Sequence, residues 1–192
     1  MIKAVIFDCF GVLATEAWLP FKARHFGHDP SLLEQATDLG NQANRGLISY
    51  SECLSLVAEL AGITQAQAQA EIARNVPNEL LFAYLRELKP HYKLGFLSNI
   101  AADHLHRIFT EDQLSIFDAV TLSYKNGFIK PQPEAYDSAA QDLGLELEEC
   151  ILVDDQERNV TGARDAGMQA VLYRDTKQFR SELEELLANP KS

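Results

Sequence analysis

Three apolar segments of this chain each end in a polar residue, and this pattern constrains the fold more than any other feature. The first segment, residues 4–7, is β-branched and aromatic, and it is followed by Asp8 and then by Gly11. Such a run is typical of a strand buried on both faces of a parallel sheet. Open α/β sheets bind their ligands at the carboxyl ends of the strands. Asp8 therefore lies where a ligand site is expected.

Helical segments alternate with the predicted strands. The strands are expected at residues 4–7, 93–98, 119–123, 150–154 and 169–173. The later helices are expected at residues 134–143, 160–166 and 177–187. Gly144 and Gly167 follow two of these helices as left-handed C-caps. The alternation predicts an α/β fold, a doubly wound, Rossmann-like parallel sheet with right-handed crossovers.

The stretch between the first two strands is too long for a plain crossover. It has helical character throughout, and Leu32, Leu33, Ala36 and Leu39 recur at helical spacing. We therefore predict an α/β core domain over residues 1–15 and 77–192, with a helical subdomain inserted over residues 16–76.

Composition excludes several classes of function. The net charge of −11 argues against nucleic acid, because non-specific binding requires lysine and arginine to neutralise phosphates. No apolar run approaches the roughly 20 residues that span a bilayer, and the N-terminus enters a strand without a signal-peptide pattern. The cysteines at positions 9, 53 and 150 lack metal-site spacing and are expected to be buried thiols. We expect a cytoplasmic protein that binds neither nucleic acid nor membrane.

Carboxylates follow or end two of the apolar strands. Asp8 follows the first, and Asp154 and Asp155 lie at the end of the strand at residues 150–154. If these strands are neighbours, the three carboxylates meet in a small volume, where like charges resist ionising together. A hard divalent cation relieves that repulsion, and Mg²⁺ bound by one or two carboxylates plus a substrate phosphate is the usual form.

Three further residues could bind an anion beside these carboxylates. Lys130 lies in a segment constrained by two prolines, where its ammonium group would offset the carboxylates and hold an anion. Ser98 and Asn99 end the second strand, where a hydroxyl and backbone N–H groups could bind phosphate oxygens. Each residue alone is also compatible with a turn, a helix cap or a solvated side chain. Together, in this order and at these strand ends, they favour a site.

These segments together resemble the haloacid dehalogenase-like (HAD) hydrolase superfamily, and the resemblance covers nearly the whole chain. In that family the opening aspartate of the first motif is the nucleophile, the second motif binds the transferred group, and the fourth binds the metal. The inserted helices are similar to the family's cap. The four matching segments are Asp8-Cys9-Phe10-Gly11-Val12-Leu13, Leu97-Ser98-Asn99, Lys130-Pro131, and Val153-Asp154-Asp155 with the residues after it.

The resemblance implies a Mg²⁺-dependent phosphatase of a small phosphorylated metabolite. Asp8 would attack phosphorus, Lys130 and Ser98 would stabilise the phosphoryl oxygens, and Asn99 would help to position them. The cofactor would be Mg²⁺, held by Asp8, the Phe10 backbone carbonyl and Asp155, with Asp154 in an outer shell. The partner would be a small-molecule substrate, and the chain would be a monomer or a homodimer.

Position 10 departs from the family's phosphatases, which carry a second aspartate there as general acid and base. Phe10 cannot move a proton, and such help is typically worth 10²–10⁴ in rate. The haloacid dehalogenase branch also lacks this aspartate and has an aromatic residue there. Two alternatives therefore stay open: a 2-haloacid dehalogenase that hydrolyses a carbon–halogen bond, and a catalytically degenerate binding module.

Two residues of the expected cap are candidates for the remaining roles. Glu16 follows the first motif and could donate the missing proton, although a surface position is the more common reason for a glutamate there. Arg45 joins two predicted helices and could bind a second anionic group of the substrate, or could be a solvated loop residue. The sequence does not identify the substrate.

Overall fold

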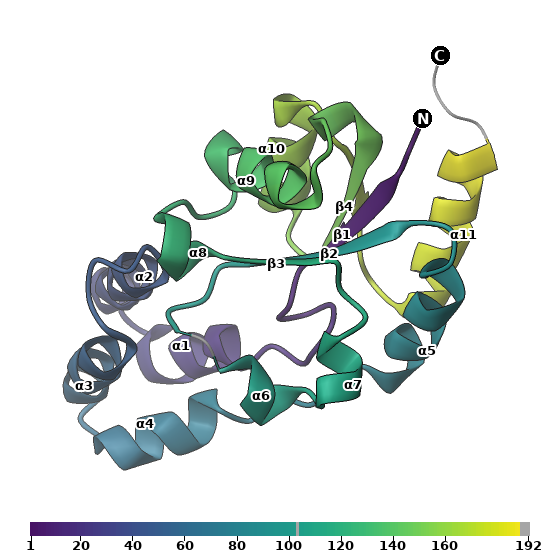
Figure 1. The fold of residues 1–192 in the computed structure, drawn as a ribbon. Coiled ribbons are helices and arrows are strands. Elements are labelled where there is room, and N and C mark those ends of the chain that lie inside the picture. Colours follow the sequence, from purple (N-terminus) through teal and green to yellow (C-terminus); the bar gives the residue numbers. More distant parts are fainter. Residues whose placement is uncertain (103, 189–192) are drawn as a thin grey trace.

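A five-stranded parallel sheet forms the centre of the molecule. The computed structural model describes residues 1–102 and 104–188. The strands lie side by side in the order β3-β2-β1-β4-β5, all parallel (Figure 1). Their bounds are β1 Ala4–Phe7, β2 Lys93–Ser98, β3 Ala119–Leu122, β4 Cys150–Asp154 and β5 Gln169–Leu172. The expected Rossmann-like α/β fold is confirmed.

Helices cover both faces of the sheet. On one face, α9 (Pro133–Leu143) and α10 (Glu157–Ala166) pack over an apolar core centred on Ile6 and Leu152. On the other, α5 (Glu79–Leu88) and α11 (Thr176–Ala188) pack over a second core that includes Phe7 and Phe96. The short helices are α6 Leu105–Ile108, α7 Glu111–Leu114, α8 Ser123–Asn126 and the 3₁₀ turn Leu147–Glu149. None of the described helices has the length and apolar character needed to cross a membrane.

The strand register brings the polar strand ends to one edge. Phe7 of β1 pairs with Phe96 of β2 on one side and with Val153 of β4 on the other. The residues that follow these three positions therefore emerge together at the carboxyl edge of the sheet. Strand burial is complete along β1 and β4, as expected for strands covered on both faces.

Element boundaries differ from the expected ones by a few residues. β3 ends at Leu122, because Ser123 already begins α8 and its hydroxyl bonds the backbone of Ile100. β5 ends at Leu172, and α10 begins at Glu157 rather than at residue 160. Such shifts are common, because helix and strand ends depend on caps and tertiary contacts.

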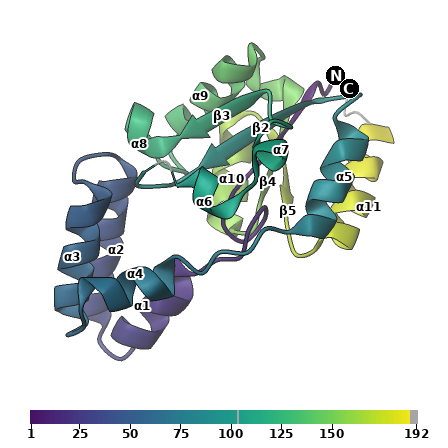
Figure 2. The same ribbon diagram turned by 60° about the horizontal axis from the view of Figure 1, so that its bottom comes forward.

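A separate lobe of four helices lies beside the carboxyl edge of the sheet (Figure 2). The helices are α1 Trp18–Phe26, α2 Pro30–Asn44, α3 Tyr50–Leu60 and α4 Gln65–Ile72. They bury their own apolar cluster around Phe21, Phe26 and Val57. Two adjacent chain segments join the lobe to the sheet, and the N–H of Thr15 donates to the carbonyl of Val76 across them. The division at residues 16 and 76 into core and cap stays a prediction.

Candidate active site

Three aspartates converge at the carboxyl edge of the sheet. Asp8 follows β1, Asp154 ends β4 and Asp155 follows it. One carboxylate oxygen from each lies within 4.8 Å of those from the other two. The Asp8 N–H donates to the Val153 carbonyl at 2.9 Å, so the parallel pairing of β1 and β4 fixes the first aspartate beside the other two.

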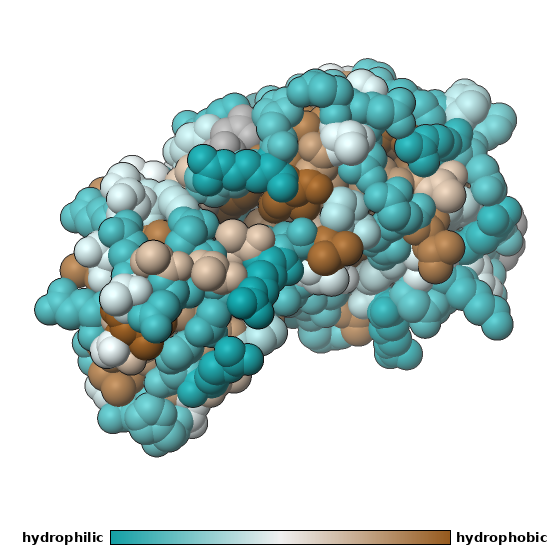
Figure 3. All heavy atoms as spheres, turned by 90° about the horizontal axis from the view of Figure 1, so that it is seen from below, coloured by the Kyte–Doolittle hydropathy of each residue, from teal (hydrophilic) through white to brown (hydrophobic). Residues whose placement is uncertain are grey.

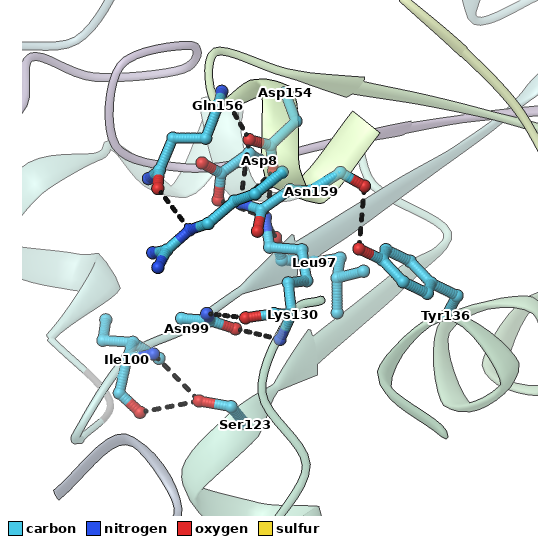
Figure 4. A network of polar contacts seen from close by, with 11 residues as sticks. Asp8, Leu97, Asn99, Ile100, Ser123, Lys130, Tyr136, Asp154, Gln156 and Asn159 are labelled. Atoms are coloured by element: carbon cyan, nitrogen blue, oxygen red, sulfur yellow. Dashed lines mark hydrogen bonds and ion pairs between the residues drawn. The ribbon is translucent and has the colours of Figure 1, made fainter. Parts of the chain in front are cut away.

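Lys130 forms a buried ion-pair network with two of these aspartates (Figure 4). Its Nζ lies 2.7 Å from Asp8 Oδ1 and 2.6 Å from Asp154 Oδ2, and it donates to the Leu97 carbonyl at 3.1 Å. Burial lowers the pKa of Lys130, but the attraction of Asp154 and Asp8 outweighs it, so the pKa is raised and the ammonium stays charged. These contacts use all three of its N–H donors.

Asn99 holds the segment that carries Lys130. Its Nδ2 donates to the Lys130 carbonyl at 3.0 Å, and the Lys130 N–H donates to its Oδ1 at 2.8 Å. The following Lys130-Pro131 peptide bond is cis. Asn99 lines the cavity, and its amide fixes the backbone of Lys130. Its contact with the substrate stays a prediction.

Asp154 is fully buried, and both of its oxygens accept hydrogen bonds. Oδ1 accepts from the Gln156 N–H at 2.9 Å and from Asn159 Nδ2 at 3.0 Å, while Oδ2 accepts from Lys130. The Asn159 carbonyl in turn accepts from the Tyr136 hydroxyl at 2.8 Å. Asn159 and Tyr136 belong to the site's support although the sequence assigned them no role. The position of Asn159 at the start of a helix after the acidic pair was the only local signal.

Asp155 is held differently. Its Oδ1 is buried without a hydrogen-bond partner among the described residues. Gly11 adopts a φ of 92°, and a Cβ built there would collide with the Asp155 carboxylate. The first motif therefore needs glycine both for its left-handed backbone and for the space that Asp155 occupies.

The cluster carries more negative than positive charge. Burial, together with Asp154 and Asp155, raises the pKa of Asp8 to about 7 despite Lys130. Burial, then Asp154 and Glu16, raise the pKa of Asp155 to about 6. One ammonium group thus faces three carboxylates, and a proton or a cation is favoured there. The unpaired Asp155 oxygen and the all-oxygen donor set fit Mg²⁺.

Ser98 lies behind the cluster in a fully buried position. Its Oγ has no hydrogen-bond partner among the described residues, although it lies near enough to the Cys9 thiol to lower the pKa of that group slightly. Burial, with the charge of Asp8, raises the pKa of that thiol, so Cys9 stays neutral. All three cysteines are buried and free, which confirms the expectation for them.

A cavity of about 450 Å³ opens from this cluster toward the helical lobe. Asp8, Lys130 and Asn99 line it from the sheet, together with Phe10 and Glu16. Residues of α1 to α4, of α6 and of α10 also line it. Figure 3 shows hydrophobic side chains along the hollow between the lobe and the sheet domain. The site therefore combines a charged end with a largely apolar wall.

Two predicted residues have positions that change their interpretation. Arg45 is exposed at the C-terminus of α2, and it is not among the residues that line the cavity. Its expected contact with the substrate is therefore not supported by this geometry. Glu16 does line the cavity, but its Oε1 accepts from the N–H groups of Trp18 and Leu19 and so caps α1.

Comparison with known proteins agrees with this fold. The family described as haloacid dehalogenase-like hydrolase matches residues 2–167. The chain therefore belongs to the haloacid dehalogenase-like hydrolases. It is 27% identical over 195 residues to the sesquiterpene phosphatase astK of Aspergillus oryzae, with 96% of each chain covered.

Two groups of solved structures share the fold. A HAD family enzyme from Bacteroides thetaiotaomicron, in complex with magnesium and inorganic phosphate, superposes with a TM-score of 0.73 at 22% identity, covering 93% of this chain and 99% of that one. The L-2-haloacid dehalogenase of Xanthobacter autotrophicus superposes with a TM-score of 0.65 at 24% identity, covering 96% and 83%. At these identities the likeness concerns the fold.

Proposed function

We propose that this hydrolase is a Mg²⁺-dependent phosphatase that acts on a small phosphorylated metabolite through an aspartyl-phosphate on Asp8. The observation that carries the proposal is the position of Asp8, which Lys130 holds beside two further aspartates in the wall of the cavity. The phosphatase name of a relative that matches the chain along nearly its whole length supports the same chemistry. The α1–α4 lobe would serve as the cap over the substrate.

In the proposed reaction, an Asp8 oxygen forms a bond to phosphorus while the bond to the leaving oxygen breaks. Water then hydrolyses the aspartyl-phosphate, which releases phosphate and restores Asp8. Lys130 orients the Asp8 carboxylate and offsets its charge. The Ser98 hydroxyl, which has no hydrogen-bond partner among the described residues, would donate to a phosphoryl oxygen.

Asp8, the Phe10 carbonyl and Asp155 would hold Mg²⁺, and Asp154 would support the site from behind, since its oxygens are already used. Bound there, the ion would neutralise charge that develops on the phosphoryl group.

Phe10 shapes the range of leaving groups. Its side chain lines the cavity and cannot donate a proton. Substrates whose leaving group has a low pKa, such as acyl or anomeric phosphates, are therefore favoured unless Glu16 supplies the proton. Glu16 would have to do so while its Oε1 caps α1.

The test is phosphate release from a panel of phosphate esters and acyl phosphates, with Mg²⁺ or with EDTA, using the Asp8→Asn variant as control. We expect turnover that requires both Mg²⁺ and Asp8, because the nucleophile and its charge compensation are then both present. A panel without any Asp8-dependent turnover at saturating Mg²⁺ would contradict the proposal.

The aromatic residue at position 10 also favours a second candidate reaction. This reaction is the hydrolysis of a 2-haloacid through an aspartyl ester on Asp8. Phe10 in the cavity wall is compatible with this reaction, because halide leaves as an anion and needs no proton donor. Halide release that resists EDTA would support this reaction, and loss of activity in EDTA would exclude it. If neither phosphate nor halide is released, the protein is a binding module. A rise in its thermal stability with Mg²⁺ and beryllium fluoride, which mimics an aspartyl-phosphate, would then show that the site still binds this ligand.

A further inference from the structure

The cavity is richer in cations than the chain as a whole. The protein has 17 lysines and arginines against 28 aspartates and glutamates. Among the described residues that line the cavity the balance is reversed: the acidic ones are Asp8 and Glu16, and the basic ones are Lys22, Arg107, Lys130 and Arg158. Lys130 is neutralised by two aspartates, so the surplus comes from the other three. Such a wall favours an anionic ligand.

Lys22 of α1 is the least expected of these cations. Its side chain lies within the helical lobe at 9% exposure, and its Nζ donates to Thr37 Oγ1 at 2.8 Å. Nζ also lies 5.7 Å from the centre of the Trp18 ring. Within the described ranges no carboxylate forms an ion pair with it. A buried ammonium group without an ion-paired carboxylate is costly, and two of its donors have no hydrogen-bond partner among the described residues.

Arg158 of α10 reaches the same cavity from the sheet domain. Its Nε donates to Gln156 Oε1 at 3.0 Å, and no described carboxylate pairs with its guanidinium. Burial and the charge of Arg158 both lower the pKa of Lys22, whereas Glu16 raises it. The two cations line the same cavity, one from the lobe and one from the sheet domain, so their charges repel each other there. An anion between them would remove that repulsion.

We propose that Lys22 and Arg158 form a second anion-binding subsite, and that the substrate carries a second anionic group, a phosphate or a carboxylate, besides the phosphoryl group at Asp8. This inference rests on the proposed phosphatase function and specifies its substrate class. Lys22 belongs to the helical lobe and Arg158 to the sheet domain. A doubly anionic ligand would therefore contact both the lobe and the sheet domain. Arg45, which the sequence suggested for this role, lies outside the cavity.

The experiment measures binding in the Asp8→Asn background, where turnover cannot interfere. The probes are straight-chain alkanediol bisphosphates and carboxyalkyl phosphates of several lengths, each compared by calorimetry with the alkyl monophosphate of equal length, in Mg²⁺. We expect the best doubly anionic probe to bind at least tenfold more tightly than its monophosphate. Lys22→Met and Arg158→Gln should each abolish most of this preference and leave monophosphate binding unchanged.

Two further variants make the result specific. Arg24→Met removes an exposed cation from the same helix and should keep the preference, because Arg24 pairs with Glu71 away from the cavity. Lys22→Arg retains the positive charge and should keep most of the preference for doubly anionic probes. Equal affinity for both probe types, or a preference that survives both Lys22→Met and Arg158→Gln, would overturn the subsite.

Failure of the phosphatase proposal is recognised separately. It would appear as absent phosphate release by the protein with Asp8 intact, whereas the subsite is judged from affinities that need no turnover. Arg158→Gln alters an exposed side chain and keeps the test valid if Lys22→Met does not fold.

Discussion

At the scale of single residues, the three aspartates of the site differ in how many hydrogen bonds and ion pairs their carboxylates make. Asp154 is saturated by hydrogen bonds, Asp8 is paired on one oxygen with Lys130, and Asp155 keeps a buried oxygen unpaired. A carboxylate that is buried without a partner destabilises the folded state when it is ionised. Asp155 therefore costs stability when no metal is bound, and binding a cation would recover that cost.

The raised pKa of Asp155, about 6, makes this cost measurable. Because the folded protein binds this proton more tightly than the unfolded chain, the group lowers stability as pH rises from its ordinary pKa near 4 through about 6. In EDTA we expect Asp155→Asn to be more stable than the parent above about pH 6, by about 1–2 kcal/mol, because partial exposure of Asp155 screens the roughly 3 kcal/mol that the pKa shift alone would give. The difference should shrink toward pH 4.

Denaturant unfolding of both proteins across this pH range measures the effect. Mg²⁺ provides the internal control, since it should stabilise the parent at pH 7.5 and leave Asp155→Asn almost unchanged. A stability difference that does not vary with pH would contradict the assignment of the buried charge to Asp155.

At the scale of elements, the site depends on contacts that hold the Lys130 segment against the end of β2 on one side and against α10 on the other. Asn99 makes two hydrogen bonds to the backbone of Lys130. Gly162 of α10 allows close packing, because a Cβ there would lie 2.7 Å from Pro131 Cβ. These contacts set the position of the Lys130 ammonium relative to Asp8.

Asn99→Ala should therefore lower kcat for phosphate release by about 10–100-fold, because small displacements of a catalytic group have large effects on rate. The measurement is steady-state kinetics at saturating Mg²⁺. Asn126→Ala is the matched control, as that side chain bonds only the Phe128 N–H in an exposed turn, and its kcat should stay near the parent value. An unchanged kcat in Asn99→Ala would show that Lys130 needs no such support.

At the scale of the whole molecule, the cavity lies where the helical lobe meets the carboxyl edge of the sheet. The lobe has its own core, and two neighbouring chain segments connect it to the sheet. The chemistry thus belongs to the sheet edge, and much of the wall that a substrate contacts belongs to the lobe.

The position of Arg45 gives a test at this scale. Arg45→Met should leave KM and kcat within about twofold of the parent, since an exposed side chain outside the cavity acts only through a screened long-range charge. Michaelis–Menten kinetics with the best phosphate substrate measures this. A rise in KM of tenfold or more would restore Arg45 as a substrate contact.

The amino-acid sequence by itself determined the fold class and the principal charged residues of the site. Buried parallel strands leave continuous apolar runs, and the residues after those runs must emerge at one sheet edge. Asp8, Asp154 and Asp155 were therefore predictable from local patterns. Lys130 lies in a loop, and only its motif context indicated it.

Only the tertiary structure decided which side chains face the cavity. Lys22 lies in the cavity wall and Arg45 does not, although both are cations of the same helical region. Glu16 caps a helix, and Tyr136 supports Asn159 from another element. The physical reason is that the direction of a helix side chain depends on how the helix packs, and contacts between distant segments leave no periodic pattern in the sequence.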